Sequence, residues 1–119
     1  MRANSTCDMM VPNVYLFHSR KKCRKFLKRN GWKKVKFYGT GAQMMYSDGM
    51  AVILMEHEGD PISEASLLVH ECYHAAYHHM DWMGEDDYGE ESMAYLIQTI
   101  AHGVLSAHGA WKAKHGMVE

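Results

Sequence analysis

The chain has 119 residues, which is enough for one domain with a modest core, and we expect a single domain over residues 1–119. Hydrophobic residues make up 47% and charged residues 23%, a balance typical of globular proteins that excludes disordered and fibrous classes. The longest apolar runs are far shorter than the ~20 residues of a membrane helix, so no membrane association is expected.

The N-terminal stretch MRANSTCDMMVPN lacks the continuous apolar core of a signal peptide, which favours a cytoplasmic protein. The three cysteines, Cys7, Cys23 and Cys72, are odd in number and form no CxxC pair. Free thiols in a reducing compartment are therefore expected instead of a disulfide framework.

Residues 13–18 form a short apolar run that is typical of a strand. Ser19 is a suitable N-cap for a helix that continues to about residue 30, and Gly31 suits the position that ends it. Residues 33–39 alternate between polar and apolar, which predicts a second strand. The residues of this helix expected to face the core are Cys23, Phe26 and Leu27.

Charge is segregated although the net charge is only −1. Ten of the thirteen Lys and Arg residues lie within residues 20–36, and residues 81–91 hold six acids and no Lys or Arg. The pattern favours one solvated helix face followed by a strand edge. A contact for an acidic partner is the alternative, and nucleic acid is less favoured because no aromatic residues interleave with the block as a base-stacking surface requires.

Residues 42–47 and 50–58 flank Asp48-Gly49, which is a strong signal for a β-hairpin. Residues 50–55 are almost continuously apolar, so we expect that strand to be buried on both faces.

After GDP at 59–61, Ser63 is a natural N-cap for a helix that runs to about residue 80. This segment is apolar almost all round, which predicts a central, buried helix. A loop then leads to a last helix over about residues 90–107. The expected order is β-α-β-β-β-α-α, an α+β fold in which a three- to four-stranded, mostly antiparallel sheet packs on the last two helices.

His70, Glu71 and His74 form the pattern HExxH on the buried helix. Residues four apart lie on one helix face, so both imidazoles can reach one Zn²⁺ ion. Glu71 lies ~100° round the helix from His70, where it can act as a general base beside the metal. The composition gives roughly 0.04 accidental matches per chain. The alternative is a pair of hydrogen-bonded core histidines with an exposed glutamate.

The third ligand must come from elsewhere. His78 lies ~12 Å along the helix axis from His70, so it and His79 are expected around the site or at the surface. The continuation HExxHxxGxxH is excluded because Tyr77 and Met80 occupy its Gly and His positions. The next helix offers Glu90, which lies nearer its apolar stripe, and Glu91. Asp87 to Glu90 also suits a capping box, which would occupy Glu90 and leave Glu91 free.

These residues resemble the glutamate-zincin metallopeptidases, which pair HExxH with a downstream ExxA. Glu91-Ser92-Met93-Ala94 matches the second motif, with sixteen residues between His74 and Glu91. The resemblance implies a zincin-like fold, His70, His74 and Glu91 as zinc ligands, and Glu71 as the catalytic base. Tyr95 stands where the family has Asp or Asn.

Over residues 41–98 the chain is also similar to small metallopeptidases encoded by tailed phages and prophages, which implies peptidase activity, in a bacterial host cell if the protein is phage-encoded, but no particular substrate. As a metallopeptidase it is expected to act on a protein or peptide. A peptidase also needs a hydrogen-bond donor that stabilises the oxyanion formed during peptide hydrolysis. The candidates for this donor are Tyr95, His102, Tyr73 and His57. We expect strand 50–55 or its neighbour to border the cleft.

A non-catalytic, zinc-binding zincin-fold protein that binds a partner protein is the alternative function. Binding of nucleic acid through residues 20–36 is a third and weaker one.

Overall fold

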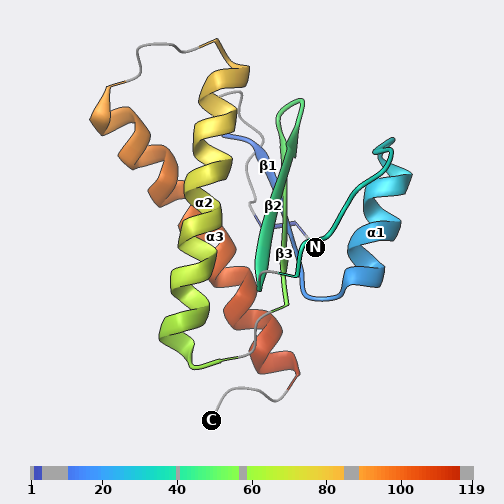
Figure 1. Cartoon of the computed structure of the whole chain (residues 1–119). Coiled ribbons are helices and arrows are strands. Elements are labelled where there is room, and N and C mark those ends of the chain that lie inside the picture. The colour runs from blue at the N-terminus through green and yellow to red at the C-terminus, as the bar shows by residue number, and fades with distance from the viewer. Residues whose placement is uncertain (1, 4–10, 40, 57–58, 85–88, 116–119) are drawn as a thin grey trace.

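The computed structural model describes residues 2–3, 11–39, 41–56, 59–84 and 89–115. Three strands form one mixed sheet in the order β1-β3-β2, with β1 parallel and β2 antiparallel to β3. Helices α2 and α3 cover one face of the sheet and α1 covers the other (Figure 1). The α+β class is therefore confirmed. The elements are β1 (Asn13–Phe17), α1 (Arg20–Arg29), β2 (Ala42–Ser47), β3 (Met50–Met55), α2 (Pro61–Trp82) and α3 (Glu90–Lys114).

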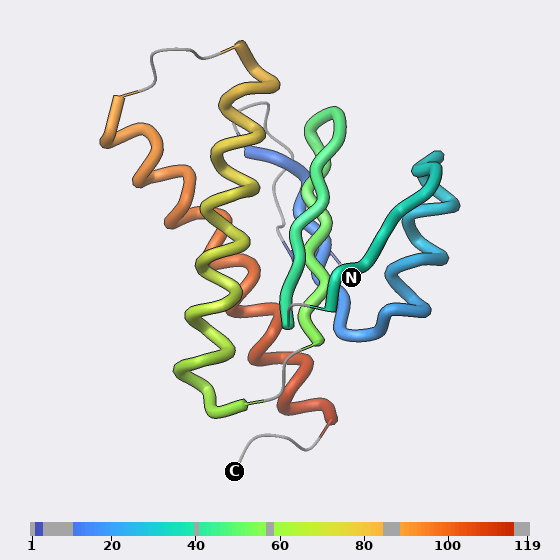
Figure 2. Tube along the Cα trace, in the orientation of Figure 1, coloured from blue at the N-terminus to red at the C-terminus, as the bar shows by residue number. Residues whose placement is uncertain are grey.

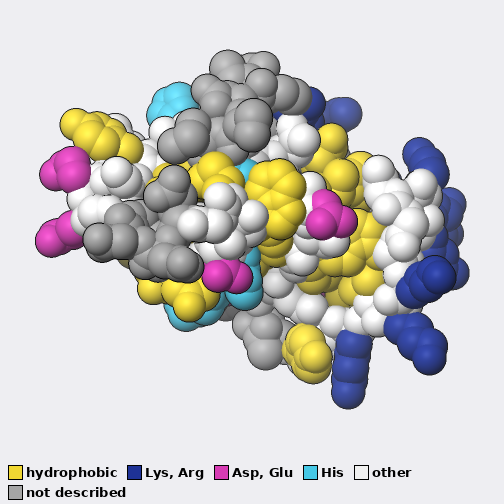
Figure 3. All heavy atoms as spheres, turned by 90° about the horizontal axis from the view of Figure 1, so that it is seen from above, with side chains coloured by type: hydrophobic (Ala, Val, Ile, Leu, Met, Phe, Trp, Pro, Cys, Tyr) yellow, Lys and Arg dark blue, Asp and Glu magenta, His cyan; other side chains and the backbone are white. Residues whose placement is uncertain are grey.

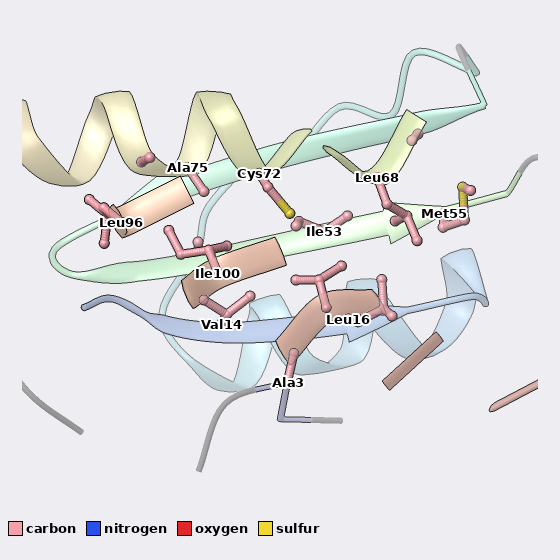
Figure 4. Packing of buried hydrophobic residues seen from close by; sticks show 14 of the residues in the cluster. Ala3, Val14, Leu16, Ile53, Met55, Leu68, Cys72, Ala75, Leu96 and Ile100 are labelled. Carbon is pink, nitrogen blue, oxygen red and sulfur yellow. The ribbon is translucent and has the colours of Figure 1, made fainter. Parts of the chain in front are cut away.

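Strand β3 is the centre of the molecule, and the prediction that it is buried on both faces is confirmed. Ala51 to Met55 are each at most 2% exposed. Because side chains alternate along a strand, Ile53 and Met55 face α2 and α3, whereas Val52 and Leu54 face α1. Figure 4 shows the larger cluster, in which Ile53 lies among Leu16, Leu68, Cys72 and Ile100.

The predicted strand over residues 33–39 is wrong. This segment contains no strand, and Lys34 has a φ of 53°, which interrupts extended backbone. Its backbone is bound by a side chain instead. The Gln43 amide donates to the Lys36 carbonyl at 2.8 Å and accepts from the Tyr38 N–H at 3.0 Å. The described part of the sheet therefore has three strands in a mixed arrangement, not a mostly antiparallel one.

Helix α1 begins and ends as predicted. The Ser19 hydroxyl accepts from the Lys22 N–H, which caps the first turn. Gly31 has a φ of 80°, and its N–H donates to the Lys28 carbonyl at 3.1 Å, as in a helix that ends on a left-handed glycine. Cys23 and Leu27 are buried against β3.

Helix α2 differs from its prediction in two ways. It begins at Pro61, and its N-cap is Asp60, whose carboxylate accepts from the Ser63 N–H at 2.9 Å. It is also not buried all round, because one side faces solvent. The large residues on that side are Val69, Tyr73 and Tyr77, which are 41%, 48% and 45% exposed. On its opposite side, α2 lies along the β2–β3 hairpin (Figure 2).

Helix α3 begins at Glu90 with Gly89 as its N-cap, and no side chain caps it. The predicted capping box is therefore wrong, because Glu90 is the first helical residue instead of the third. Asp87 lies outside the described residues. The helix continues to Lys114, well beyond the expected end at 107. None of the helices in the described segments is long and apolar enough to cross a membrane.

Candidate metal centre

Two imidazoles of the HExxH motif converge on the surface of α2. Nε2 of His70 and Nε2 of His74 lie 3.1 Å apart. His70 is exposed and His74 is half-buried, so the expectation that both are enclosed within a buried helix is wrong. Two nitrogens each 2.0–2.1 Å from a tetrahedral zinc would be about 3.3 Å apart. The observed separation of the two Nε2 atoms therefore fits two ligands of one zinc ion.

Glu71 is the buried member of the motif, at 8% exposure. Its carboxylate accepts from the backbone N–H of Met44, in the edge strand β2. Burial raises the pKa of Glu71 above its ordinary value, and His70, His74 and the Met44 N–H act in the opposite direction. The glutamate is thus held beside the histidines without belonging to the same helix face.

An open groove of about 880 Å³ runs along the N-terminal half of α2 and the beginning of β2. Its lining is mainly apolar, apart from the acid and hydroxyl groups near the start of the helix. His70 and Glu71 both line the groove, so the motif meets a concave surface. The remaining lining residues are Ala42, Asp60, Ile62, Ser63, Ser66 and Leu67.

Glu91 and Glu90 lie on the exposed first turn of α3. Among the described residues, no three or more His, Cys, Asp or Glu side chains are close enough together to hold a metal ion. Within the described segments the structure therefore brings together His70 and His74 but places no third ligand beside them. Glu91 as that ligand, and zinc itself, stay predictions.

The proposed oxyanion donors are also dispersed. Tyr95 is 63% exposed, His102 is exposed, and neither lines the groove. The Tyr73 ring lies 5.8 Å from the His74 ring, edge to face, so this described candidate is in ring contact with the imidazole pair. His57 lies outside the described residues.

The two histidines after the motif differ sharply. His78 is exposed, as expected, but His79 is only 1% exposed. Nδ1 of His79 is hydrogen-bonded to the Tyr46 hydroxyl at 2.7 Å, and burial raises the pKa of that tyrosine to about 12. His79 therefore fixes the end of α2 to the hairpin instead of surrounding the metal centre.

Sequence reasoning missed a second cluster, formed by Glu64, His108 and His18. Nε2 of His108 lies 2.9 Å from Oε1 of Glu64, and Nδ1 of His108 lies 2.8 Å from Nε2 of His18. The three residues come from α2, α3 and the end of β1, far apart in the sequence. One signal was present, because His108 follows Val104 by four residues and so continues the apolar face of α3.

The basic residues of 20–36 lie on the other side of the sheet from the groove. In Figure 3, Lys and Arg side chains gather over α1, whereas acidic side chains are scattered over the rest of the visible surface. Two of the arginines are engaged locally. Arg20 forms a two-pronged ion pair with Glu56 at 2.8 and 3.1 Å, and the Arg24 guanidinium lies 4.6 Å from the centre of the Phe37 ring.

No protein-family model, curated protein or solved structure matches this chain. The site is therefore assigned from its own residues and their geometry.

Proposed function

We propose that the chain is a zinc-dependent metallopeptidase that hydrolyses peptide bonds in a protein or peptide. The observation that carries the proposal is the 3.1 Å separation of the two Nε2 atoms of His70 and His74. At this distance the two rings can share a hydrogen bond between their Nε2 atoms, and because His70 is exposed, a zinc ion from solvent could take the place of that hydrogen bond. The groove beside it, with Glu71 in its wall, offers a place for a substrate.

In this proposal His70 and His74 hold the zinc, and Glu91 is the third ligand from the ExxA segment. Zinc, when bound, would polarise the scissile carbonyl and make an attacking water more acidic. Glu71 accepts the proton of that water and passes it to the leaving amine. The Met44 N–H orients the Glu71 carboxylate for this task, since it holds the side chain against β2.

The substrate would lie along β2. Strand β3 is central, so of the two strands of the hairpin only β2 lies at an edge of the sheet. Ala42, at its beginning, lines the same groove as His70 and Glu71. An extended peptide can add to such an edge by backbone hydrogen bonds, with its side chains in the groove. The mainly apolar lining favours apolar substrate residues there.

A zinc-binding protein without catalysis is the second candidate, and one observation favours it. The Glu71 carboxylate already accepts from the Met44 N–H and is buried between α2 and β2. A glutamate so engaged can serve to anchor the edge strand to the helix. In that case the zinc would stabilise a surface that binds a partner protein.

The variant Glu71→Gln separates the two candidates, because glutamine keeps the size and the acceptor oxygen but cannot take up a proton. Zinc content is measured by metal analysis and hydrolysis with a library of quenched fluorescent peptides. The metallopeptidase binds one zinc per chain, and the variant keeps the zinc but loses hydrolysis by about 10²–10⁴-fold. A zinc-loaded wild-type chain that cleaves nothing, or a variant as active as the wild type, would leave only the second candidate.

Glu91→Ala and Glu90→Ala form a matched pair for the third ligand, since both residues are exposed on the first turn of α3. We expect Glu91→Ala to lose zinc and Glu90→Ala to retain it. The reverse result would assign the ligand to Glu90, and retention of zinc by both variants would exclude this turn of α3 from the site.

A further inference from the structure

Between Pro61 and Met80 the solvent-facing side of helix α2 carries no Lys, Arg, Asp or Glu residue. The helix contains no Lys or Arg, and its acids in this range, Glu64 and Glu71, are buried. A helix side in water ordinarily carries charged residues. An exposed surface without them is typical of a contact with another molecule. The large exposed residues on this side are Ile62, Val69, Tyr73 and Tyr77.

Three of these residues form a stripe beside the imidazole pair, and they are Val69, Tyr73 and Tyr77. They follow one another at four-residue intervals, so they share one helix face. The Tyr73 ring lies 6.4 Å from the Tyr77 ring and 5.8 Å from the His74 ring, measured between ring centres. Each imidazole of the pair follows directly after a stripe residue in the chain. Any molecule that covers the stripe therefore also meets the two imidazoles.

The number of zinc ligands points to a second copy of this chain. His70 and His74 place their Nε2 atoms 3.1 Å apart, which suits two ligands of one zinc ion. A closed zinc site takes four ligands, and the described residues bring no third His, Cys, Asp or Glu beside the pair. A two-fold axis through the metal brings the same pair from both copies. Two copies therefore supply a complete set of four imidazoles.

The charge of the two sides of the molecule also favours the stripe as the contact between copies. Two copies can meet at the stripe without repulsion, since it holds no Lys, Arg, Asp or Glu. At α1, by contrast, seven of the ten residues are Lys or Arg, so two copies would repel each other there.

A shared zinc ion would have its countercharge within such a dimer. Zinc bound by neutral imidazoles retains two positive charges. His70 and His74 lie close enough to the Glu71 carboxylate to act on its pKa, in the direction that favours the ionised form. A metal cation between these imidazoles acts in the same direction. Two copies bring two such carboxylates, which equals the charge of the ion.

We propose, on the basis of the zinc site of the proposed function, that two copies of this chain share one zinc ion through His70 and His74 of each. The stripes of the two copies pack against each other around the metal. Four imidazoles leave no position on the zinc for a water molecule or a scissile carbonyl. The second copy also covers the end of the groove that His70 lines. The dimer is therefore the inactive form of the metallopeptidase, and the monomer with its own zinc is the active form.

The ratio of zinc to protein sets which form is present. At one zinc ion per two chains, every ion is shared and the dimer forms. Excess zinc provides one ion for each chain, so mass action converts the shared site into two separate ones. The dimer should therefore form and then dissociate as zinc is added. A contact made by apolar packing alone would respond to protein concentration but not to zinc.

Analytical ultracentrifugation of the full-length chain tests this at one protein concentration, with a chelator, with about half an equivalent of zinc chloride and with a severalfold excess. We expect a monomer, then a dimer that contains one zinc ion per two chains by metal analysis, and then a monomer again. A monomer at every ratio would overturn the shared site, even if that monomer binds zinc and cleaves peptides. A dimer that persists in the chelator would also overturn it.

The same experiment separates the shared site from the proposed function. The monomer formed in excess zinc is assayed with the peptide library, and we expect it to cleave peptides that the dimer does not. A zinc-dependent dimer whose zinc-loaded monomer cleaves nothing would uphold the shared ion and count against the metallopeptidase alone. A dimer as active per chain as the monomer would overturn the closed site.

A charge placed in the stripe should separate dimer formation from zinc binding. Tyr77→Glu adds a carboxylate from each copy to the contact, so dimer formation should weaken by about 100-fold or more. The monomer of this variant should bind zinc like the wild type, because Tyr77 is not a ligand. Tyr38→Glu is the matched control, since Tyr38 is also an exposed tyrosine, at 65%, but lies outside α2. It should form the dimer like the wild type.

Two results with these variants would overturn the stripe as the contact between copies. One is a similar loss of the dimer in both variants, which would show a general effect of added negative charge. The other is a Tyr77→Glu variant that forms the dimer normally but cleaves peptides more slowly as a monomer, which would assign the stripe to the substrate.

Discussion

Helix α2 carries a carboxylate–imidazole cluster on each of two sides, and the two clusters are constructed in opposite ways. Glu64, facing α3, is buried, and its carboxylate accepts from Lys112, His108 and a backbone N–H. On the groove side His70 is exposed and approaches His74 with no carboxylate between them. The comparison teaches that the buried cluster has its hydrogen-bonding partners within the protein, as a stabilising cluster requires, whereas the groove-side imidazole is open to solvent, as the proposed metal site requires.

Glu64→Gln should have the largest effect on stability. Loss of the carboxylate leaves the Lys112 ammonium and His108 buried without their anion, which costs about 3–5 kcal/mol in the free energy of unfolding. Urea denaturation measures this cost. Glu56→Gln is the matched control, because its ion pair with Arg20 is partly exposed and should contribute little to stability. Similar costs in both variants would contradict the structural role given to the buried cluster.

His70→Ala should have a large effect on zinc binding and a small effect on stability. Removal of one imidazole should weaken zinc binding by about 100-fold or more, since even residues that only support a ligand contribute 10–100-fold. Because His70 is exposed, the stability of the metal-free chain should change by less than about 0.5 kcal/mol. Zinc affinity is measured by competition with a chelator. His78→Ala, one turn beyond His74, serves as the control and should bind zinc like the wild type.

Acid should lower the stability of the fold through His18 and Glu64, which belong to the buried cluster. The pKa of His18 is about 4 in the folded chain and 6.5 ordinarily, so between these values the unfolded state binds more protons. Stability therefore falls as the pH drops from about 6.5 to about 4, by roughly 1–3 kcal/mol after allowance for solvent near the ring. Glu64, with a pKa lowered to about 2, adds a further loss as the pH falls below about 4.5.

The matched variant for this pH effect is His18→Phe, which retains a ring against Trp111 but cannot be protonated. Thermal unfolding of both proteins between pH 4 and 7 isolates the contribution of His18. The slope of stability against pH should be shallower in the variant. Parallel curves would contradict the lowered pKa of His18.

Asp60→Ala should have a small effect on stability. It removes the acceptor for the Ser63 N–H at the start of α2, which typically costs about 1 kcal/mol. Asp60→Ser restores a capping oxygen and should recover most of the loss in chemical denaturation. If the serine variant were no more stable than the alanine variant, the cap would not be the source of the effect.

Local patterns predicted the parts of the fold that local forces determine. The Asp48-Gly49 hairpin, the buried strand β3 and the glycine that ends α1 depend on a few neighbouring residues, and the structure confirms them. The strand expected over residues 33–39 failed because Gln43 binds that backbone through its side chain, a contact that periodicity cannot reveal.

The candidate site was predictable only within one turn of helix. HExxH spacing places His70 and His74 together, because four residues return the chain to the same face. The contact between Glu71 and Met44 depends on how α2 packs on β2. The hydrogen bonds that connect Glu64, His108 and His18 join residues from distant parts of the chain. Neither has a sequence spacing, so both required the tertiary structure.

The two buried cysteines, Cys23 and Cys72, lie where their chemical labelling can measure local opening of the fold. Cys23 belongs to the cluster under α1 and Cys72 to the one under α2 and α3, on opposite faces of the sheet. Burial raises the pKa of these thiols to about 11 and about 12, so neither is reactive while it is enclosed. Alkylation of each thiol would therefore require its own layer to separate from the sheet. The two labelling rates would measure how independently the halves of this small domain open.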